Sequence, residues 1–214
     1  MSPQVCRAID LLFLSVCRFV DDGIYDKEAA LFHLRCSAKC GILPAILTLA
    51  RTYAGMPHDL LSEVEVESET GEEERTARAF SLFEEAAYMG NRASMVFVAR
   101  ALDTGENLGE PARKSSRLAL DWYEKICERD AEGGVGDTDG GFDDARYLIL
   151  ARMAEMYLGG GCDDGGLKKD AQRAAELYNE AAETAMAAMK GKLANKYYMY
   201  AEEAWAQVDE VESA

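Results

Sequence analysis

The stretch from Asp170 to Ala206 constrains the fold of this chain more than any other. Its alanines and aromatic residues recur at three- and four-residue steps, through Tyr178 and Ala185 to Trp205. This is the period of an α-helix with one face of small side chains and one face of bulky ones. Small faces let helices approach closely, and aromatic side chains then fill the space between neighbours. The stretch therefore predicts helices packed side by side.

The same pattern recurs earlier in the chain, which indicates a repeat. In one set of predicted helices an alanine precedes a large side chain by three residues, and in a second set a short triplet recurs. The first set is Ala50 with Tyr53, Ala99 with Leu102 and Ala154 with Tyr157; the second is Glu85-Ala86-Ala87, Lys125-Ile126-Cys127 and Glu180-Ala181-Ala182. The intervals are unequal, and an acidic insertion and a glycine-rich loop explain the difference.

Apolar periodicity and turn residues predict a wholly helical chain. The chain has only 4 prolines, and two of them, Pro44 and Pro111, suit the first turn of a helix. The predicted helices cover residues 3–20, 26–40, 44–55, 74–89, 92–103, 111–128, 143–158, 169–189 and 191–208.

The predicted organisation has four parts. Residues 1–23 form an N-terminal helix that packs on the array, and residues 24–129 form helical hairpins with an acidic insertion at 62–74. Residues 130–144 form a flexible loop rich in glycine and aspartate, and residues 145–214 form a last hairpin and a C-terminal helix.

The charge of the chain restricts its partners. A formal net charge of −16 repels nucleic-acid phosphates and anionic membranes, so neither is expected as a partner. A basic patch on another protein is the natural complement, although acidity can also serve solubility alone. The cysteines show no CxxC spacing, which favours buried thiols in a reducing, cytoplasmic setting.

The sequence offers little for catalysis, metals or cofactors. His33, Cys36 and Cys40 share one helix face, but a structural zinc site needs four ligands, so a cysteine-rich packing face is the better interpretation. No glycine-rich phosphate loop follows a strand, and we expect no catalytic residue, metal or cofactor in this chain.

Two motifs carry a resemblance to known families. The pattern Ala-x-x-x-Leu-Ala-x-x-Tyr-x-Gly, followed by Asp-x-x-x-Ala-x-x-Leu-Tyr-x-x-Ala-Ala, resembles the Sel1-like repeat, a relative of the tetratricopeptide repeat. The resemblance implies an all-α fold, an α-solenoid of stacked antiparallel helical hairpins.

A narrower resemblance lies near the end of the sequence. The run Ala185–Tyr198, continued by Ala201–Gln207, resembles the C-terminal region of the elongation factor 2 kinases, which are calmodulin-activated alpha-kinases. The resemblance implies a non-catalytic region that recruits elongation factor 2 and helps couple it to the alpha-kinase domain, with calmodulin involved at most indirectly. The alternative is a free-standing Sel1-like adaptor with another protein partner.

The candidate docking residues are Leu193, Tyr197, Tyr198, Ala201 and Trp205. Four of them fall four residues apart on one stripe, which suits a helix that inserts into a partner's groove. The same stripe could instead cap the array by packing on its own neighbour. The family resemblance favours docking, with Trp205 as the anchor. Tyr147, Tyr157 and Tyr178 with Trp122 could line a groove but are better explained as core.

Overall fold

The computed structural model describes residues 27–57, 71–110, 112–131, 144–160 and 167–212. Within these ranges the chain is all-α, as predicted, with no strand. The helices are α2 (Lys27–Lys39), α3 (Leu43–Tyr53), α4 (Glu72–Tyr88), α5 (Arg92–Thr104), α6 (Ser116–Ala131), α7 (Arg146–Gly159), α8 (Ala171–Ala187) and α9 (Gly191–Glu212). The predicted helix at 3–20, residues 62–70 of the acidic insertion and residues 132–143 of the predicted loop lie outside the described residues.

The chain divides into two compact units. Unit 1 consists of Met1–Asn91 and Asn107–Arg113, and unit 2 consists of Arg92–Glu106 and Lys114–Ala214. The boundary lies between α4 and α5, inside the predicted hairpin segment 24–129. The four-part organisation expected from the sequence stays a prediction.

Unit 1 is held together by helix α3, which packs against both α2 and α4. Ala45 and Ala50 of α3 and Ala86 of α4 have no exposed surface. Because these side chains are so small, the helices approach closely and larger residues fill the remaining space. The core cluster of unit 1 contains Leu34, Ala38, Ala45, Ile46, Leu49, Tyr53, Ala79 and Ala86.

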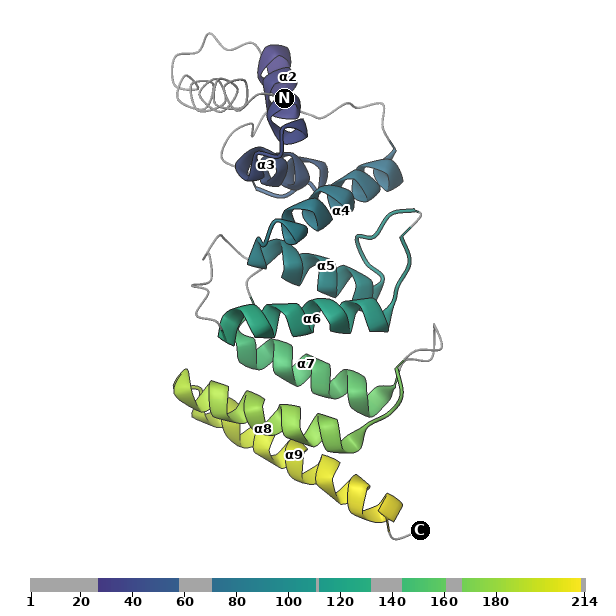
Figure 1. The fold of residues 1–214 in the computed structure, drawn as a ribbon, viewed down its shortest axis with the longest axis vertical. Helices are drawn as coiled ribbons and strands as arrows, with labels where there is room; N and C mark the ends of the chain where they lie inside the picture. The colour runs from purple at the N-terminus through teal and green to yellow at the C-terminus, as the bar shows by residue number, and fades with distance from the viewer. Residues whose placement is uncertain (1–26, 58–70, 111, 132–143, 161–166, 213–214) are drawn as a thin grey trace. The chain divides into compact units, whose positions relative to one another are not determined.

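In unit 2, each helix from α5 to α9 packs against the next one in the chain (Figure 1). Ala99 and Ala154 of the first predicted set, and Ala181 and Ala182 of the second, are completely buried. The repeated alanines therefore mark the contacts between successive helices. This arrangement is the stacking of helical hairpins that the sequence predicts, and it confirms the fold class.

The sequence left open whether four aromatic residues line a binding groove or belong to the core, and two of them are buried in the core. Trp122 and Tyr178 are 5% and 4% exposed, whereas Tyr147 and Tyr157 are half-buried. The predicted cysteine face is less buried than expected, since Cys36 and Cys40 are both of intermediate exposure, as is Cys127 elsewhere in the chain.

Two helix starts differ from the prediction. Helix α6 begins at Ser116 rather than at Pro111, and the Ser115 hydroxyl accepts a hydrogen bond from the Leu118 N–H at 3.4 Å. A serine just outside the helix thus serves as the start signal instead of the proline. Helix α4 begins at Glu72, so the last glutamates of the predicted insertion are helical. Acidic side chains are favourable there because the N-terminus of a helix carries partial positive charge.

The connection after α5 contributes to unit 1. Gly109 has a φ of +63°, and a Cβ placed on it would lie 2.4 Å from the Ala77 Cα of α4. Only glycine fits so close to another backbone in this left-handed conformation. The connection therefore lies close to α4 at Gly109, and residues 107–113 group with unit 1.

Candidate docking surface

The last hairpin, α8 with α9, contains all five predicted docking residues. The two helices are joined by an alanine-rich seam in which Ala181 and Ala185 of α8, and Ala194, Ala201 and Ala204 of α9, are at most 2% exposed. The buried residues of α9 follow one another at spacings of three and four, and Tyr197 is among them. This spacing places one stripe of α9 against α8.

A cluster of tyrosines closes the seam near its middle. The Tyr178 ring lies 6.4 Å from that of Tyr197, at an interplanar angle of 25°, and 5.5 Å from that of Tyr200. Burial raises the pKa of Tyr178 to about 12 and also raises the pKa of Tyr197. Both hydroxyls therefore stay protonated at neutral pH, and the cluster serves packing between α8 and α9.

The structure separates the predicted docking residues into two groups. Tyr197 and Ala201 are 6% and 2% exposed, so they belong to the seam and are covered by the protein itself. Leu193 is half-buried at the edge of the seam. Tyr198 and Trp205 are 37% and 38% exposed and thus available to another molecule. The stripe of four-residue steps is therefore partly a packing face, and the docking role of all five residues stays a prediction.

Tyr198 and Trp205 lie on one flank of α9. They are seven residues apart, which is two helical turns, and Glu202 lies between them on the same side. All three are exposed. We call Tyr198, Glu202 and Trp205 the aromatic flank. Two large rings with a carboxylate between them suit a protein partner that offers apolar and cationic groups.

Sequence reasoning missed further exposed apolar residues in the same hairpin. Met186 and Met189 at the α8–α9 turn are 50% and 93% exposed, and Met199 of α9 is 60% exposed. Nothing in a periodicity argument singles out these methionines, because a turn has no period. Exposed methionines are common where a surface adapts to a partner, so they extend the candidate surface.

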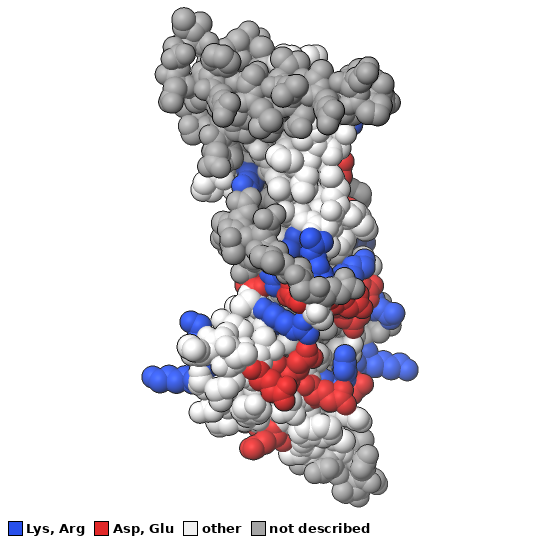
Figure 2. Space-filling model, turned by 60° about the vertical axis from the view of Figure 1, so that its left-hand side comes forward, with Lys and Arg blue, Asp and Glu red and all other residues white. Residues whose placement is uncertain are grey.

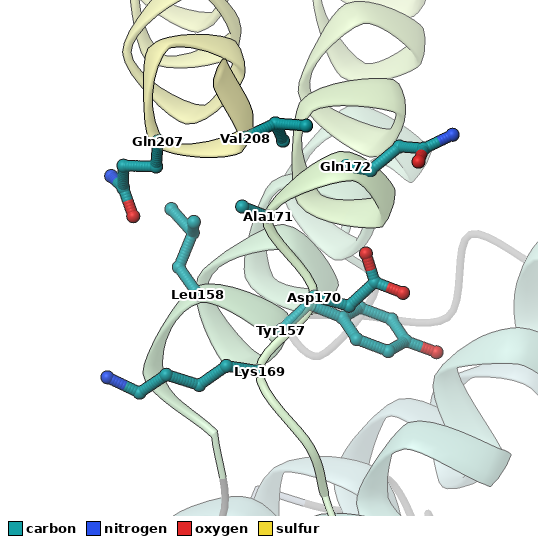
Figure 3. Close-up of a pocket in the computed structure, with 8 residues that line it drawn as sticks. All are labelled: Tyr157, Leu158, Lys169, Asp170, Ala171, Gln172, Gln207 and Val208. Atoms are coloured by element: carbon teal, nitrogen blue, oxygen red, sulfur yellow. The ribbon is translucent and has the colours of Figure 1, made fainter. Parts of the chain in front are cut away.

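A pocket lies at the other end of the hairpin, where α7 ends, α8 begins and the last turns of α9 pass (Figure 3). Its volume is about 390 Å³, which is within the range of small binding cavities. Figure 3 shows Leu158 directed toward α9, with Lys169 and Gln207 on that side and the Tyr157 ring on the other. Its lining is Tyr157, Leu158, Lys169, Asp170, Ala171, Gln172, Gln207 and Val208.

The polar residues of this pocket are partly committed to the fold. The Asp170 carboxylate accepts a hydrogen bond from the Arg173 N–H at 2.8 Å and caps α8, while the Asp170 N–H donates to the Tyr157 carbonyl at 3.0 Å. The pocket is thus a small apolar hollow with a polar rim. It lies two to three residues beyond Trp205 in α9 and can receive a partner's side chain.

Unit 2 also carries a network of arginine–carboxylate pairs that join different segments. Two arginines bind a carboxylate with two hydrogen bonds each: Arg92 binds Asp130 at 2.7 and 2.8 Å, and Arg152 binds Asp103 at 2.6 and 2.8 Å. Figure 2 shows acidic and basic side chains lying next to one another over α6 to α8. Because these charges are paired, we assign them to the stability of the unit rather than to a catalytic site.

The described residues contain neither a metal-binding cluster nor a membrane-spanning helix. Among them, no three histidine, cysteine, aspartate or glutamate side chains are placed to hold a metal ion. Of the helices in that part of the chain, none has both the length and the apolar character needed to cross a bilayer.

Comparison with known proteins identifies a repeat and a group of relatives. The Sel1 repeat matches residues 14–42, 70–91, 93–130 and 150–183. The chain is 46% identical over 195 residues to the human protein "Eukaryotic elongation factor 2 kinase", covering 90% of this chain and 26% of that protein. The protein of the same name from Caenorhabditis elegans is 42% identical over 201 residues, covering 83% of this chain and 26% of that protein. The chain thus spans about a quarter of the length of these relatives.

Solved structures of Sel1 repeat proteins are more distant. A Sel1 repeat protein from Oxalobacter formigenes is 18% identical with a TM-score of 0.47, covering 95% of this chain and 76% of that one. The protective antigen c5321 of uropathogenic Escherichia coli is 19% identical with a TM-score of 0.45, covering 96% of this chain and 40% of that one.

Proposed function

This chain belongs to the Sel1 repeat family, and on that premise we propose that it is the substrate-docking region of an elongation factor 2 kinase. In this proposal it binds elongation factor 2 and presents it to an alpha-kinase catalytic domain, and thereby regulates translation elongation in the cytoplasm. The chain itself transfers no phosphate. Calmodulin acts on it only indirectly, through the rest of the kinase.

The observation that carries the proposal is where the similarity falls. Nine-tenths of this chain is 46% identical to a quarter of a protein whose name states its substrate, and that quarter corresponds to helical repeats. Helical repeats present extended surfaces for protein partners rather than enclosed reaction sites. A kinase that carries such a region has a ready means of holding a large protein substrate.

Within the chain, we assign docking on the catalytic domain to the C-terminal half of α9. The aromatic flank supplies the anchor, because Trp205 exposes 38% of its surface and tryptophan is enriched among residues that dominate binding energy. The neighbouring pocket beside Val208 receives an apolar side chain of the same partner. Tyr197 and Ala201 act indirectly, by fixing α9 on α8.

The direct test is binding of purified elongation factor 2 to this chain by isothermal titration. We expect a one-to-one complex. In competition, an excess of the isolated chain should displace elongation factor 2 from a kinase that contains the same region. Absence of binding by a chain with intact helical circular dichroism would contradict the proposal, and would favour an adaptor with another partner.

The second test concerns the anchor. We expect Trp205→Ala to weaken binding of the catalytic domain about 30-fold, as truncation of a central aromatic anchor does, while the helix content is kept. Leu148→Ala is the matched control, since Leu148 is 41% exposed on α7. If Trp205→Ala instead abolishes cooperative unfolding and Leu148→Ala does not, the indole caps the fold and docking is not its role.

A further inference from the structure

Within the described part of the chain, four helix ends share one hydrogen-bond pattern. In each, an N–H just beyond the helix donates to a carbonyl five residues earlier: Ile42 to Ser37, Met56 to Arg51, Asn91 to Ala86 and Lys190 to Ala185, at 2.8–3.2 Å. The residue before each donor has a positive φ. This is the Schellman motif, in which glycine is preferred because the left-handed conformation brings a Cβ too close to the backbone.

The last of these turns departs from the others. Gly41, Gly55 and Gly90 occupy the left-handed position in the first three, with φ of 77°, 65° and 90°. Met189 occupies it at the α8–α9 turn, with φ of 58°. A methionine therefore stands where the same chain uses glycine three times, in a conformation that is unfavourable for any side chain.

Packing does not explain this methionine. The Met189 side chain is 93% exposed, so no burial offsets the unfavourable backbone conformation. Met186, one turn earlier, is 50% exposed. Residues 187, 188 and 190 are exposed as well, so the turn projects from the hairpin. A strained, solvent-facing apolar side chain is a feature that binding can explain and folding cannot.

The charge around the turn is unlike that of the whole chain. From Thr184 to Ala201 the sequence contains three lysines and no aspartate or glutamate, in a protein of net charge −16. Lys190 and Lys192 are exposed, and neither forms an ion pair with any residue that the structure describes. We call Met186, Met189, Lys190 and Lys192 the methionine–lysine turn.

We propose that the methionine–lysine turn is the contact that binds elongation factor 2, with Met189 and Met186 entering an apolar pocket and Lys190 and Lys192 pairing with carboxylates at its rim. The inference rests on the proposed function and deepens it by naming the residues that meet the substrate. Flexible, polarizable methionine side chains fill irregular apolar pockets well, and lysines beside them add charge complementarity and a faster encounter.

The position of the turn supports a separate role from the aromatic flank. The turn lies at the start of α9, and Trp205 lies about 20 Å farther along the helix at 1.5 Å per residue. Two surfaces at this separation can hold two proteins at once, which a region that links substrate and catalytic domain must do. An acidic protein surface fits the turn better than lipid or nucleic acid, because the remaining acidic surface of the chain repels both.

The experiment compares variants of this chain in titrations with purified elongation factor 2. Met189→Gly restores the residue used in the other three turns, so we expect an unchanged or higher midpoint of thermal unfolding together with at least tenfold weaker binding. Met189→Leu keeps an apolar side chain and retains binding within threefold.

The double change Lys190→Ser and Lys192→Ser weakens binding and reduces its dependence on salt concentration. Met89→Ala, which removes an exposed methionine from the end of α4 in unit 1, is the matched control and leaves binding unchanged.

The possible outcomes separate the two proposals. If elongation factor 2 binds the unaltered chain and Met189→Gly binds equally well, the turn is not the contact, while the docking function stands. If elongation factor 2 does not bind the unaltered chain, both proposals fall. Binding of the unaltered chain to vesicles of phosphatidylserine and phosphatidylcholine, or to a 20-nucleotide RNA, as tightly as to elongation factor 2 would also overturn the assignment.

Discussion

In unit 1 the contact between α3 and α4 is made mainly by apolar side chains, whereas in unit 2 arginines bind carboxylates on other segments. Ile46 and Leu49 are typical of the first kind, and they are 0% and 4% exposed. Arg92, 6% exposed, is typical of the second and binds Asp130 of α6. Arg78 of unit 1 instead binds Glu74 one turn away in the same helix, and it donates a longer hydrogen bond, 3.4 Å, to the Tyr53 hydroxyl of α3.

The difference indicates how each unit fixes the positions of its helices. Apolar contacts are not directional, so the helices of unit 1 are positioned by the shapes of their side chains. A bidentate arginine–carboxylate pair has a defined geometry, so it also specifies which residues must lie opposite each other. Unit 2 also contains both surfaces to which we assign docking, and a fixed geometry of its helices keeps those surfaces in place.

The largest effect should come from breaking a buried pair. We expect Arg92→Met to lower the free energy of unfolding of unit 2 by about 3 kcal/mol, because it leaves the Asp130 carboxylate without its partner in a buried site. Both tryptophans, Trp122 and Trp205, lie in unit 2, so their fluorescence during urea unfolding reports this unit.

The matched change in unit 1 is Arg78→Met. Its pair with Glu74 is exposed, with 42% of the Arg78 side chain accessible, and its hydrogen bond to the Tyr53 hydroxyl of α3 is long at 3.4 Å, so we expect a loss of only about 1 kcal/mol in the transition followed by circular dichroism. Equal losses for the two variants would show that the units do not differ in the way that we describe.

The next largest effect concerns the connection that packs on α4. Gly109→Ala should cost unit 1 about 2 kcal/mol, because the new Cβ would lie 2.4 Å from the Ala77 backbone at a φ of +63°. Gly41→Ala is the control: its φ of +77° is similar, but a Cβ there meets no atom within 4 Å, so we expect about 1 kcal/mol. The measurement is urea unfolding by circular dichroism, and similar costs at the two sites would exclude the packing role of Gly109.

Alkaline pH should weaken unit 2 through its tyrosine cluster. Burial raises the pKa of Tyr178 from 10.0 to about 12, so the folded protein keeps a proton that the unfolded chain loses in this range. The stabilisation is complete below pH 10 and is lost between pH 10 and about 12, by up to about 1.4 kcal/mol per pH unit. Tyr178→Phe should flatten this decline in tryptophan-monitored unfolding, and an unchanged slope would remove Tyr178 as the cause.

The smallest effect is in thiol chemistry. Cys127 of unit 2 is half-buried, and burial raises the pKa of its thiol from 9.0 to about 11. Because the thiolate is the reactive form, we expect Cys127 to react slowly with iodoacetamide at pH 8 and faster as the pH approaches 11. Mass spectrometry of labelled peptides gives the rate, with Cys36 of unit 1 as the internal comparison. Rapid labelling of Cys127 at pH 8 would contradict the expectation.

Sequence reasoning recovered the helices and their contacts because both depend on local pattern. Ala50, Ala99 and Ala154, aligned from their spacing alone, are all completely buried. The Sel1-like resemblance and the similarity to elongation factor 2 kinases were also carried by short motifs and are supported by the comparisons. Helix starts were less accurate, since Pro111 and Ser115 are both acceptable start signals and tertiary packing decides between them.

The candidate surface and the buried ion pairs were predicted less completely, for physical reasons. A stripe on a helix does not say whether it faces solvent or a neighbour, so Tyr197 and Ala201 were grouped with Trp205 although they are buried against the protein itself. The predicted helices at 169–189 and 191–208 place Met189 inside a helix, whereas it is the left-handed residue of the α8–α9 turn. Arg92 and Asp130 lie 38 positions apart in the sequence, and no local pattern relates them.

The connection at residues 107–113 has a consequence for how this region can be inherited. Because unit 1 includes this connection, the chain passes from one unit to the other three times, after Asn91, after Glu106 and after Arg113. A single recombination crossover between α4 and α5 would therefore leave unit 1 without residues 107–113, whereas unit 2 would keep both of its own segments. Unit 1 is complete only in a chain that also carries α5, the first helix of unit 2, so unit 1 cannot be gained or exchanged without part of unit 2.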